Sequence, residues 1–522
     1  MSVKAPSVLR LLHQHKQKTS ISATISNVLS SMDPERAKKT KRSPRASVSP
    51  STSPFKQMPR IPAISSAAFK DLQNHSKLTA CQLAVLSRVA LDRESVFYTG
   101  GAGTGKSFLL SEIIHQLKTS KSLTSPECVA VTAPTGIAAV NVQGCTLHSF
   151  VGAGLFGSKS VDAIVRHISV KNKKALERWR SVEVLVIDEV SMVSGDTFDK
   201  LEAVARRLRG SHLPFGGIQL IVTGDFFQLP PIQQDKQAKF AFEAASWAAC
   251  FQRNTFTLKE IFRQKDEQLI RVLNEIRLGQ ASKETISFIK SLSRPISGAV
   301  IEPTKLFATR NQVHAANLER LDNIREQEHV YNAYDHGIEP YYVDKLSQCC
   351  LAPEELVLKP GAQVMLLKNL KGVKGALNER PAEKNWRTDN IAFANGSIGV
   401  VVKCLADEVV VDFFDSASLR PGLRKHRVRV RREEWSILDA DGSRLATRTQ
   451  IPLMLSYALS IHKSQGQSLP CVSVDLQRVF EMGQAYVALS RATCLEGLQV
   501  LNFDASKVRA DKRAVHFYES LL

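Results

Sequence analysis

The sequence contains no apolar run long enough to cross a bilayer, no CxxC pair and no histidine spacing suited to zinc. A transmembrane helix needs about 20 consecutive apolar residues, so we expect a protein without a membrane partner. Structural zinc sites need closely spaced cysteine and histidine ligands. The nine cysteines are scattered along the chain, and we therefore expect reduced side chains that hold no metal.

Acidic residues are nearly missing from the N-terminal segment, where residues 1–65 contain twelve Lys or Arg and only two acidic residues. This segment is rich in Ser and Pro and shows no sustained apolar periodicity, so we expect a disordered basic tail. The KKTKR cluster at residues 38–42 favours a nuclear address. The first 32 residues, which carry Ser and Thr but no acidic residue, also suit a mitochondrial presequence. We expect the nucleus, with the mitochondrion as the alternative.

The chain does have length and positive charge. Its 522 residues exceed the usual size of a single domain, so we expect two major domains. The formal net charge of +20 and the pI of about 9.6 create a field that attracts polyanions. Composition therefore favours a soluble protein that contacts nucleic acid.

Short apolar segments alternate with helical stretches from about residue 78 onward. Buried parallel strands read as continuous apolar runs, so this alternation predicts an α/β fold with parallel sheets. The runs fall into two sets, at residues 96–98, 128–132, 184–187 and 220–222, and at residues 306–308, 472–474 and 498–500. We place one domain at residues 66–250 and a second at residues 251–334 and 449–522.

Residues 335–448 differ in sequence pattern from the α/β segments, because short apolar runs there are separated by turn residues. This pattern predicts a small antiparallel β-barrel, of the SH3-like kind, inserted into the second domain. Within it, Arg427, Arg429 and Arg431 alternate with two valines. The alternation favours a solvated face over a half-buried strand rather than a nucleic-acid contact.

The motif GGAGTGKS follows a predicted strand and precedes a helical run. It matches the phosphate-binding loop G-x-x-x-x-G-K-[ST], in which backbone N–H groups wrap around phosphates. Lys106 supplies a point charge, and Ser107 offers a hydroxyl to Mg²⁺ at a helix N-terminus. The predicted nucleotide-binding residues of the loop are Gly100, Gly101, Ala102, Gly103, Thr104, Gly105, Lys106 and Ser107.

Two carboxylates follow the apolar run VLVI, as expected for a strand that ends beside the phosphate loop. We expect Asp188 to hold Mg²⁺ with Ser107 and Glu189 to orient the attacking water. The run LIVTGDFFQLPP follows the same design and delivers Gln228, whose amide is placed to sense a γ-phosphate. An NKxD element that would read guanine is missing, so ATP is the expected nucleotide.

These motifs, in this order, resemble the petite-integration-frequency family of DNA helicases in the B branch of superfamily one. The resemblance spans roughly residues 75 to 505 and includes LTACQLAVL, TAPTGIAAVNVQGCTLHSF, IFRQKDEQLIRVLNEIRLG, LSYALSIHKSQGQSL and AYVALSRAT. It implies two RecA-like domains with ATP between them. It also implies that Gln82 contacts adenine and that Arg263 and Arg491 act as arginine fingers on the transferred phosphoryl group.

The resemblance further implies contacts to single-stranded DNA in two parts of the chain. Small hydroxyls and backbone amides can bind successive phosphates, and an aromatic ring can stack on a base. The expected DNA-binding residues are Pro134, Thr135, Gly136, Thr146, His148, Ser149 and Phe150, with His462, Lys463, Ser464, Gln465 and Gly466. A wedge element is expected at about residues 150–180.

The sequence as a whole therefore predicts a monomeric, ATP-dependent motor that unwinds forked DNA in genome maintenance, with the family's 5′-to-3′ polarity. Two other functions stay open. One is a helicase or ATPase stimulated by RNA, because phosphate-directed contacts do not exclude RNA. The other is a nucleic-acid-binding scaffold that has lost hydrolysis.

Overall fold

Two parallel sheets and four antiparallel sheets form the part of the chain that the computed structural model describes. The described residues are 78–119, 128–153, 159–231, 238–251, 253–296, 301–373, 391–393, 395–414, 425–438 and 444–521. All of them belong to one compact unit, Arg60–Leu522. The basic tail expected at residues 1–65 lies outside the described residues, and so do the features that suggested an address.

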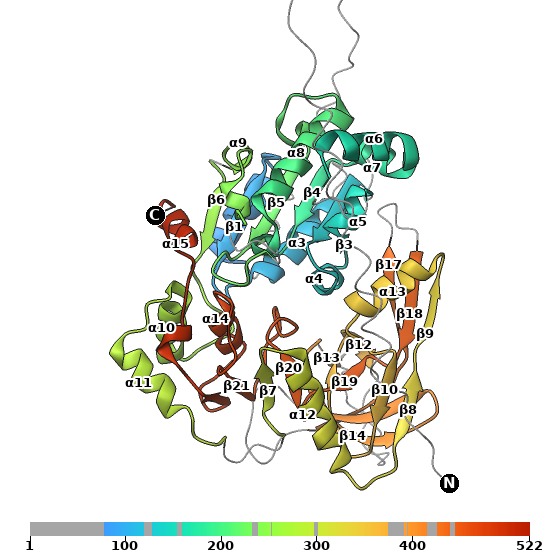
Figure 1. Ribbon diagram of the computed structural model, residues 1–522, viewed down its shortest axis with the longest axis vertical. Coiled ribbons are helices and arrows are strands. Elements are labelled where there is room, and N and C mark those ends of the chain that lie inside the picture. The colour runs from blue at the N-terminus through green and yellow to red at the C-terminus, as the bar shows by residue number, and fades with distance from the viewer. Residues whose placement is uncertain are drawn as a thin grey trace, which may run out of the picture. The chain divides into compact units, whose positions relative to one another are not determined.

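The first parallel sheet has six strands in the order β3-β2-β4-β5-β1-β6 (Figure 1). Every residue of β1, β4 and β5 is buried, as their continuous apolar runs predict. The strands are β1 (Val96–Gly100), β2 (Val129–Ala133), β3 (Cys145–Thr146), β4 (Val184–Ile187), β5 (Gln219–Gly224) and β6 (Thr255–Leu258). The helices of this region are α2 (Ala80–Ala90), α3 (Lys106–Thr119), α4 (Gly136–Asn141), α5 (Leu147–Val151), α6 (Val161–Lys171), α7 (Lys173–Ser181), α8 (Gly195–Arg209) and α9 (Trp247–Phe251).

The second parallel sheet has four strands in the order β20-β7-β21-β22. Its strands are β7 (Thr304–Phe307), β20 (Ala458–Ser460), β21 (Val472–Asp475) and β22 (Leu498–Leu501). The accompanying helices are α10 (Glu267–Leu278), α11 (Lys283–Ser291), α12 (Arg310–Asp322), α14 (Gln484–Leu489) and α15 (Lys512–Glu519). The mixed α/β class with two parallel sheets is therefore confirmed.

The segment between β7 and β20 forms the antiparallel sheets. A five-stranded sheet has the order β16-β15-β14-β11-β19, and a three-stranded sheet has the order β17-β18-β9. The elements are β8 (His329–Asn332), β9 (Tyr334–Gly337), α13 (Pro340–Cys349), β10 (Glu355–Leu358), β11 (Gln363–Leu366), β12 (Leu370–Val373), β13 (Ile391–Phe393), β14 (Ile398–Cys404), β15 (Glu408–Phe414), β16 (Lys425–Arg431), β17 (Glu433–Leu438), β18 (Arg444–Gln450) and β19 (Leu453–Leu455). The insert thus extends a few residues beyond the expected limits, 335 and 448, because β8 and β19 pair within these sheets.

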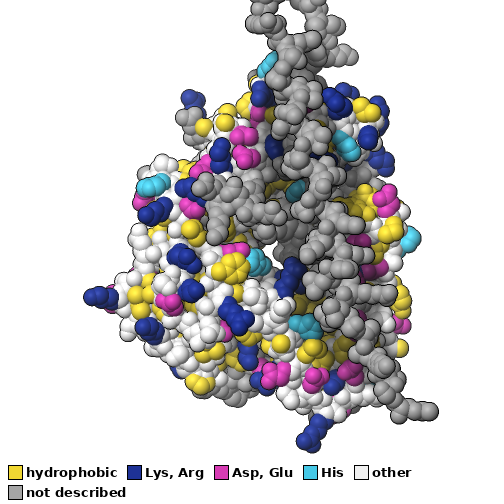
Figure 2. All heavy atoms as spheres, viewed as in Figure 1, with side chains coloured by type: hydrophobic (Ala, Val, Ile, Leu, Met, Phe, Trp, Pro, Cys, Tyr) yellow, Lys and Arg dark blue, Asp and Glu magenta, His cyan; other side chains and the backbone are white. Residues whose placement is uncertain are grey.

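The arginine face of β16 is solvated, as its alternation predicts. Val428 and Val430 are buried, and Arg427, Arg429 and Arg431 form ion pairs with acidic residues of β15. Exposed ion pairs of this kind contribute roughly 1 kcal/mol or less each. Figure 2 shows Lys and Arg side chains interspersed with Asp and Glu over the face in view.

The expected bounds of both parallel-sheet domains need correction. The strand β6 pairs in parallel with β1, so the first sheet extends past residue 250, where the sequence placed its end. Its TFTL run is too short to assign to either sheet from sequence.

No described helix is both long and apolar enough to cross a membrane.

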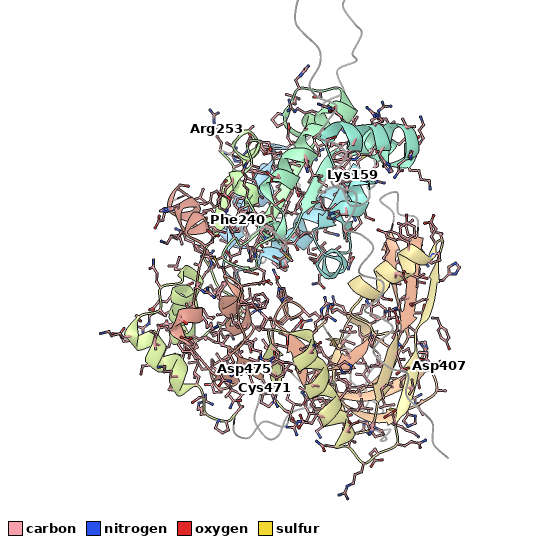
Figure 3. All side chains as sticks on the ribbon, in the orientation of Figure 1. Lys159, Phe240, Arg253, Asp407, Cys471 and Asp475 are labelled. Carbon is pink, nitrogen blue, oxygen red and sulfur yellow. The ribbon has the colours of Figure 1, made fainter. Side chains whose placement is uncertain are left out.

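The last helix, α15, packs on the first sheet and not on the second, although residues 449–522 were expected to belong to the second domain. Phe517 stacks on Phe242 with ring centroids 4.3 Å apart and lies 6.2 Å from the ring of Phe97 in β1. The guanidinium of Arg513 lies over the ring of Phe240, which Figure 3 labels. The C-terminal helix therefore ties the end of the second domain to the core of the first.

Candidate functional site

The phosphate loop connects β1 to α3 and packs closely against the chain that follows β6. Gly103 and Gly105 have φ angles of +84° and +80°, which glycine adopts without strain. A Cβ atom at Gly103 would lie 2.7 Å from the Cβ of Arg263. Within the loop, the Thr104 hydroxyl donates to the Gly101 carbonyl at 2.9 Å. The loop thus needs glycine where the chain after β6 approaches it.

Lys106, the first residue of α3, points its ammonium back into the loop. Its Nζ donates to the carbonyl oxygens of Gly100 and Gly101 at 2.7 and 3.0 Å. Burial lowers the pKa of Lys106, and the charges of Asp225 and Glu189 oppose this shift. The charge of Lys106 is therefore held where the loop would receive a phosphate.

Asp188 and Glu189 follow the buried strand β4. Glu189 has a φ of +50°, unusual for a side-chain-bearing residue, and its N–H donates to Asp188 Oδ1 at 2.8 Å. Burial and the neighbouring charge of Glu189 raise the pKa of Asp188 to about 7. Burial also raises the pKa of Glu189, while the charges of Lys106 and Arg491 and a hydrogen bond from Gln465 oppose the shift.

One carboxylate oxygen of Glu189 is an unpaired acceptor. Its Oε2 is buried without a hydrogen-bond partner among the residues that the structure describes. A buried acceptor without a partner costs about 1–3 kcal/mol. A water molecule that donates to this atom would satisfy it and would be polarised toward attack.

The oxygen donors beside Lys106 fit Mg²⁺. This ion takes one or two protein oxygens and completes its shell with phosphates and water. Ser107 exposes its hydroxyl at the start of α3, and Asp188 lies close enough to feel the charge of Lys106. Ser107 and Asp188 are therefore the residues that would hold the ion.

A pH-dependent stability is expected from Asp188. Its folded pKa of about 7 lies above the ordinary 3.8, so the protein loses stability as pH rises from 3.8 through 7. Between pH 5.5 and 7 the loss in the free energy of unfolding amounts to about 2 kcal/mol. Asp188→Asn removes the titrating carboxyl and therefore removes this loss. The melting temperature of the ligand-free variant should exceed that of the wild type by about 2 °C more at pH 8 than at pH 5.5. A difference that stays constant with pH would contradict the assignment.

Arg263 and Arg491 reach this site from the chain beyond β6 and from the end of α14. Arg491 is 1% exposed, and its Nη1 donates to the carbonyl oxygens of Ser464 and Gln467, each at 3.3 Å. Arg263 donates to the carbonyl oxygens of Ser490 and Gly466 at 3.1 and 3.4 Å. The structure therefore places Arg263 against the phosphate loop, beside Gly103, and places Arg491 near enough to Glu189 for its charge to act on that carboxyl.

The two guanidiniums crowd one another. Burial and the like charge of Arg263 lower the pKa of Arg491 to about 9, so the group is still charged at neutral pH. Burial also lowers the pKa of Arg263. Carbonyl oxygens accept hydrogen bonds from both guanidiniums, but these oxygens are neutral and do not neutralise the guanidinium charges. An anionic phosphoryl group would therefore be a better partner than those they now have.

A buried ion pair that sequence reasoning missed joins the two parallel-sheet domains. Asp225, at the end of β5, accepts from Arg277 of α10 at 2.8 and 3.1 Å and is 0% exposed. The Arg277 guanidinium lies 4.5 Å from the ring centroid of Phe227 and 5.1 Å from that of Tyr518. Burial tends to raise the pKa of Asp225, but Arg277 outweighs this effect and the pKa lies below its usual value.

Removing Arg277 should destabilise the protein strongly. Arg277→Ala leaves a buried carboxylate without its partner, which costs roughly 3–5 kcal/mol and should lower the melting temperature by about 4 °C. Arg271→Ala, on an exposed position of the same helix, should change it by less than about 2 °C. Asp225→Asn should recover part of the loss in the Arg277→Ala background. Equal melting temperatures for Arg277→Ala and Arg271→Ala would refute this role.

Two aromatic residues at the loop also escaped sequence reasoning. Tyr486 of α14 accepts the N–H of Ala102 at 2.7 Å through its hydroxyl. Phe262 exposes 53% of its surface, and its ring lies 3.5 Å from where a Cβ of Gly105 would stand. The only sequence feature that could have identified these two residues is their position, since each lies within a motif that also holds a predicted arginine finger.

Gln82 lies against the phosphate loop. Its Oε1 accepts the N–H of Thr79 in the capping box that begins α2. Its Nε2 lies 2.9 Å from where a Cβ of Gly105 would stand. Gln82 is therefore placed at the edge of the loop, while its contact with adenine stays a prediction.

The first predicted DNA segment lies at the starts of α4 and α5, where DNA contact stays a prediction for all its residues except Phe150, for which it is wrong. The hydroxyls of Thr135 and Thr146 accept N–H groups at the starts of α4 and α5, which also contain Gly136, His148 and Ser149. Phe150 is fully buried, with its ring centroid 4.7 Å from that of Trp179. Its ring completes the hydrophobic core, so it cannot stack on a base. Pro134 is half-buried just before α4.

In the second predicted DNA segment, residues 462–466, the side chains contact different parts of the protein. His462 is paired with Glu481 at 3.0 Å, and Lys463 is half-buried. The Ser464 hydroxyl is fully buried and donates to the Ile461 carbonyl at 2.8 Å, so the predicted side-chain contact of Ser464 with DNA is wrong. Gln465 faces Glu189 and Gln228 instead. DNA contact by the remaining residues stays a prediction.

Gln228 lies at the same junction. It is buried, its N–H donates to the Asp225 carbonyl, and its Oε1 accepts from Gln465. A Cβ at Gly483 would meet the carbonyl of Phe227 at 2.4 Å. The segment after β5 therefore packs directly against the chain that precedes α14.

Comparison with known proteins agrees with this arrangement. The PIF1-like helicase family profile matches residues 74–288, and that of the DNA helicase Pif1 2B domain matches residues 342–378. The Emericella nidulans ATP-dependent DNA helicase PIF1 is 43% identical over an alignment of 490 positions, which covers 84% of this chain and 63% of that protein. The chain therefore spans less than two thirds of that relative.

Two solved structures resemble the chain over most of its length. A crystal structure of Pif1 helicase from Candida albicans is 42% identical with a TM-score of 0.68, covering 86% of this chain and 100% of that one. A Bacteroides Pif1 structure in complex with ADP-AlF3 and single-stranded DNA is 27% identical with a TM-score of 0.56, covering 85% and 97%. With identity at this level over a whole solved chain, the protein belongs to the PIF1-like helicase family.

Proposed function

We propose that this protein is an ATP-dependent DNA helicase that moves 5′ to 3′ along single-stranded DNA and unwinds forked duplexes. One observation carries the proposal: Arg263 of the second domain packs against the loop that holds Lys106, and the charges of Lys106 and Arg491 both act on Glu189. The names of relatives, which describe ATP-dependent DNA helicases, and a relative bound to single-stranded DNA support it.

The geometry suggests how hydrolysis would move the domains. Phosphates in the loop would attract both guanidiniums away from the backbone carbonyls that they now bind, which draws the second domain toward the first. Mg²⁺, held by Ser107 and Asp188, would neutralise part of the phosphate charge. Glu189 would take a proton from the attacking water. After phosphate leaves, the guanidiniums would return to the carbonyls, so the two states differ in domain contacts.

Finer features belong to the same proposal. The five-stranded antiparallel sheet is consistent with an SH3-like barrel, and α6 and α7 occupy the region expected to act as a wedge. We further propose a monomeric motor that acts in replication, repair, recombination or telomere maintenance, in the nucleus or alternatively the mitochondrion.

Strand displacement on duplexes with a 5′ or a 3′ single-stranded tail tests the proposal. We expect unwinding only from the 5′ tail, only with hydrolysable ATP. Turnover stimulated by RNA but not by DNA would favour the RNA-dependent alternative. Binding of single strands without any ATP turnover would favour a scaffold.

A further inference from the structure

The turn at residues 461–467 brings a predicted DNA-binding segment to the hydrolytic site. Gln465 N–H donates to the His462 carbonyl, and Gln467 N–H donates to the Ser464 carbonyl at 3.0 Å. Gly466 has a φ of +79°, which closes the turn without strain. The Ser464 hydroxyl fastens the turn from inside through the Ile461 carbonyl. Hydrogen bonds between its own residues therefore connect the two ends of the turn.

Both arginines predicted to act as fingers hold the backbone of this turn. Arg491 donates to the carbonyls that precede and follow the Gln465–Gly466 pair, those of Ser464 and Gln467. Arg263 donates to the Gly466 carbonyl at 3.4 Å. A phosphoryl group that captured these guanidiniums would release three carbonyl oxygens of the turn. Nucleotide and turn thus compete for the same donors.

The side chain of Gln465 extends from the turn to the hydrolytic residues. Its Nε2 donates to Gln228 Oε1 at 3.4 Å, and its side chain also hydrogen-bonds Glu189. The residue is only half-buried, whereas Gln228 is 6% exposed. A primary amide carries two donors and one acceptor, so Gln465 can hold a carboxylate and a second amide together.

We propose that Gln465 is a positioning residue for ATP hydrolysis, which aligns Glu189 and Gln228 when the turn at residues 461–467 carries a single strand. This inference rests on the proposed function and reassigns Gln465 from DNA binding to coupling. DNA on the outer face of the turn, through His462 and Lys463, would fix the turn. The Gln465 amide would then orient Glu189 toward the attacking water, so that single strands accelerate hydrolysis.

The isosteric variant Gln465→Met tests the role, because it keeps the volume and removes every hydrogen bond. At saturating single-stranded oligothymidylate, we expect kcat for ATP hydrolysis to fall about 100-fold, the lower end of the range for loss of one aligned hydrogen bond at a reacting centre. KM for ATP, the Kd for the oligonucleotide and the salt dependence of that Kd should stay within about twofold. Gln280→Met, on an exposed position after α10, is the matched control and should match the wild type.

The outcomes separate coupling from DNA binding. A kcat within twofold of the wild type at saturating DNA would overturn the proposal, whatever the Kd. A tenfold rise in Kd, with the salt dependence unchanged because Gln465 carries no charge, would return Gln465 to the DNA-binding residues. Failure of the proposed function itself would look different, because the wild type would then show no turnover that single strands stimulate.

Discussion

Lys106→Ala should reduce ATP turnover by about 10³-fold while the Kd for single-stranded DNA changes by less than about threefold. The ammonium is the only lysine charge within the phosphate loop and lies between two of its carbonyl oxygens. Removing it leaves the developing charge on the transferred phosphate without a preorganised counter-charge, which costs several kcal/mol. Single-strand contacts are expected on other segments, so they should persist.

A steady-state assay with and without oligothymidylate measures the turnover, and fluorescence anisotropy measures the affinity. Lys118→Ala is the matched control, because Lys118 is an exposed residue at the last turn of the same helix. It should leave both quantities within about twofold. Hydrolysis by Lys106→Ala at the wild-type rate would mean that nucleotide binds elsewhere, and the whole site assignment would fail.

The nucleotide side of the site could be predicted from sequence because its residues are local to strand ends. The loop follows β1 and Asp188 follows β4, and the carboxyl ends of parallel strands meet at one edge of a sheet. Continuous apolar runs identified these strands without ambiguity. Arg263 and Arg491 carried no such signal, and only the family resemblance placed them.

Two of the errors share a physical cause, since they concern partners distant in sequence. Phe150 follows hydroxyl residues that suit phosphate binding, yet Trp179 and the helix α7 enclose its ring. The pair of Asp225 and Arg277 is separated by 52 positions, and Tyr518 reaches both from the last helix. No periodicity or spacing reports such contacts, because tertiary packing alone creates them.

Arg491→Ala should lower kcat by about 10³-fold, since an arginine finger contributes a factor of 10³ to 10⁵. Arg491→Lys should recover little, because lysine lacks the planar fork whose Nε and Nη1 now donate to the carbonyl oxygens of Val487 and Ser464 and that would bind a phosphoryl group at two points. Nucleotide binding, followed with a fluorescent ATP analogue, should weaken less than tenfold, because the phosphate loop remains intact.

A purely structural role for Arg491 predicts a different pattern. Its burial means that both variants should lower the melting temperature, so stability alone cannot assign the role. The assignment depends on kcat at saturating ATP, measured below the melting transition, against Arg478→Lys as an exposed control. If Arg491→Lys melts earlier but turns over ATP at the wild-type kcat, the guanidinium holds the turn at residues 461–467 and does not act on the phosphate. If kcat falls while nucleotide still binds, the charge acts in the transition state, and the carbonyls that it holds in this structure are its resting partners.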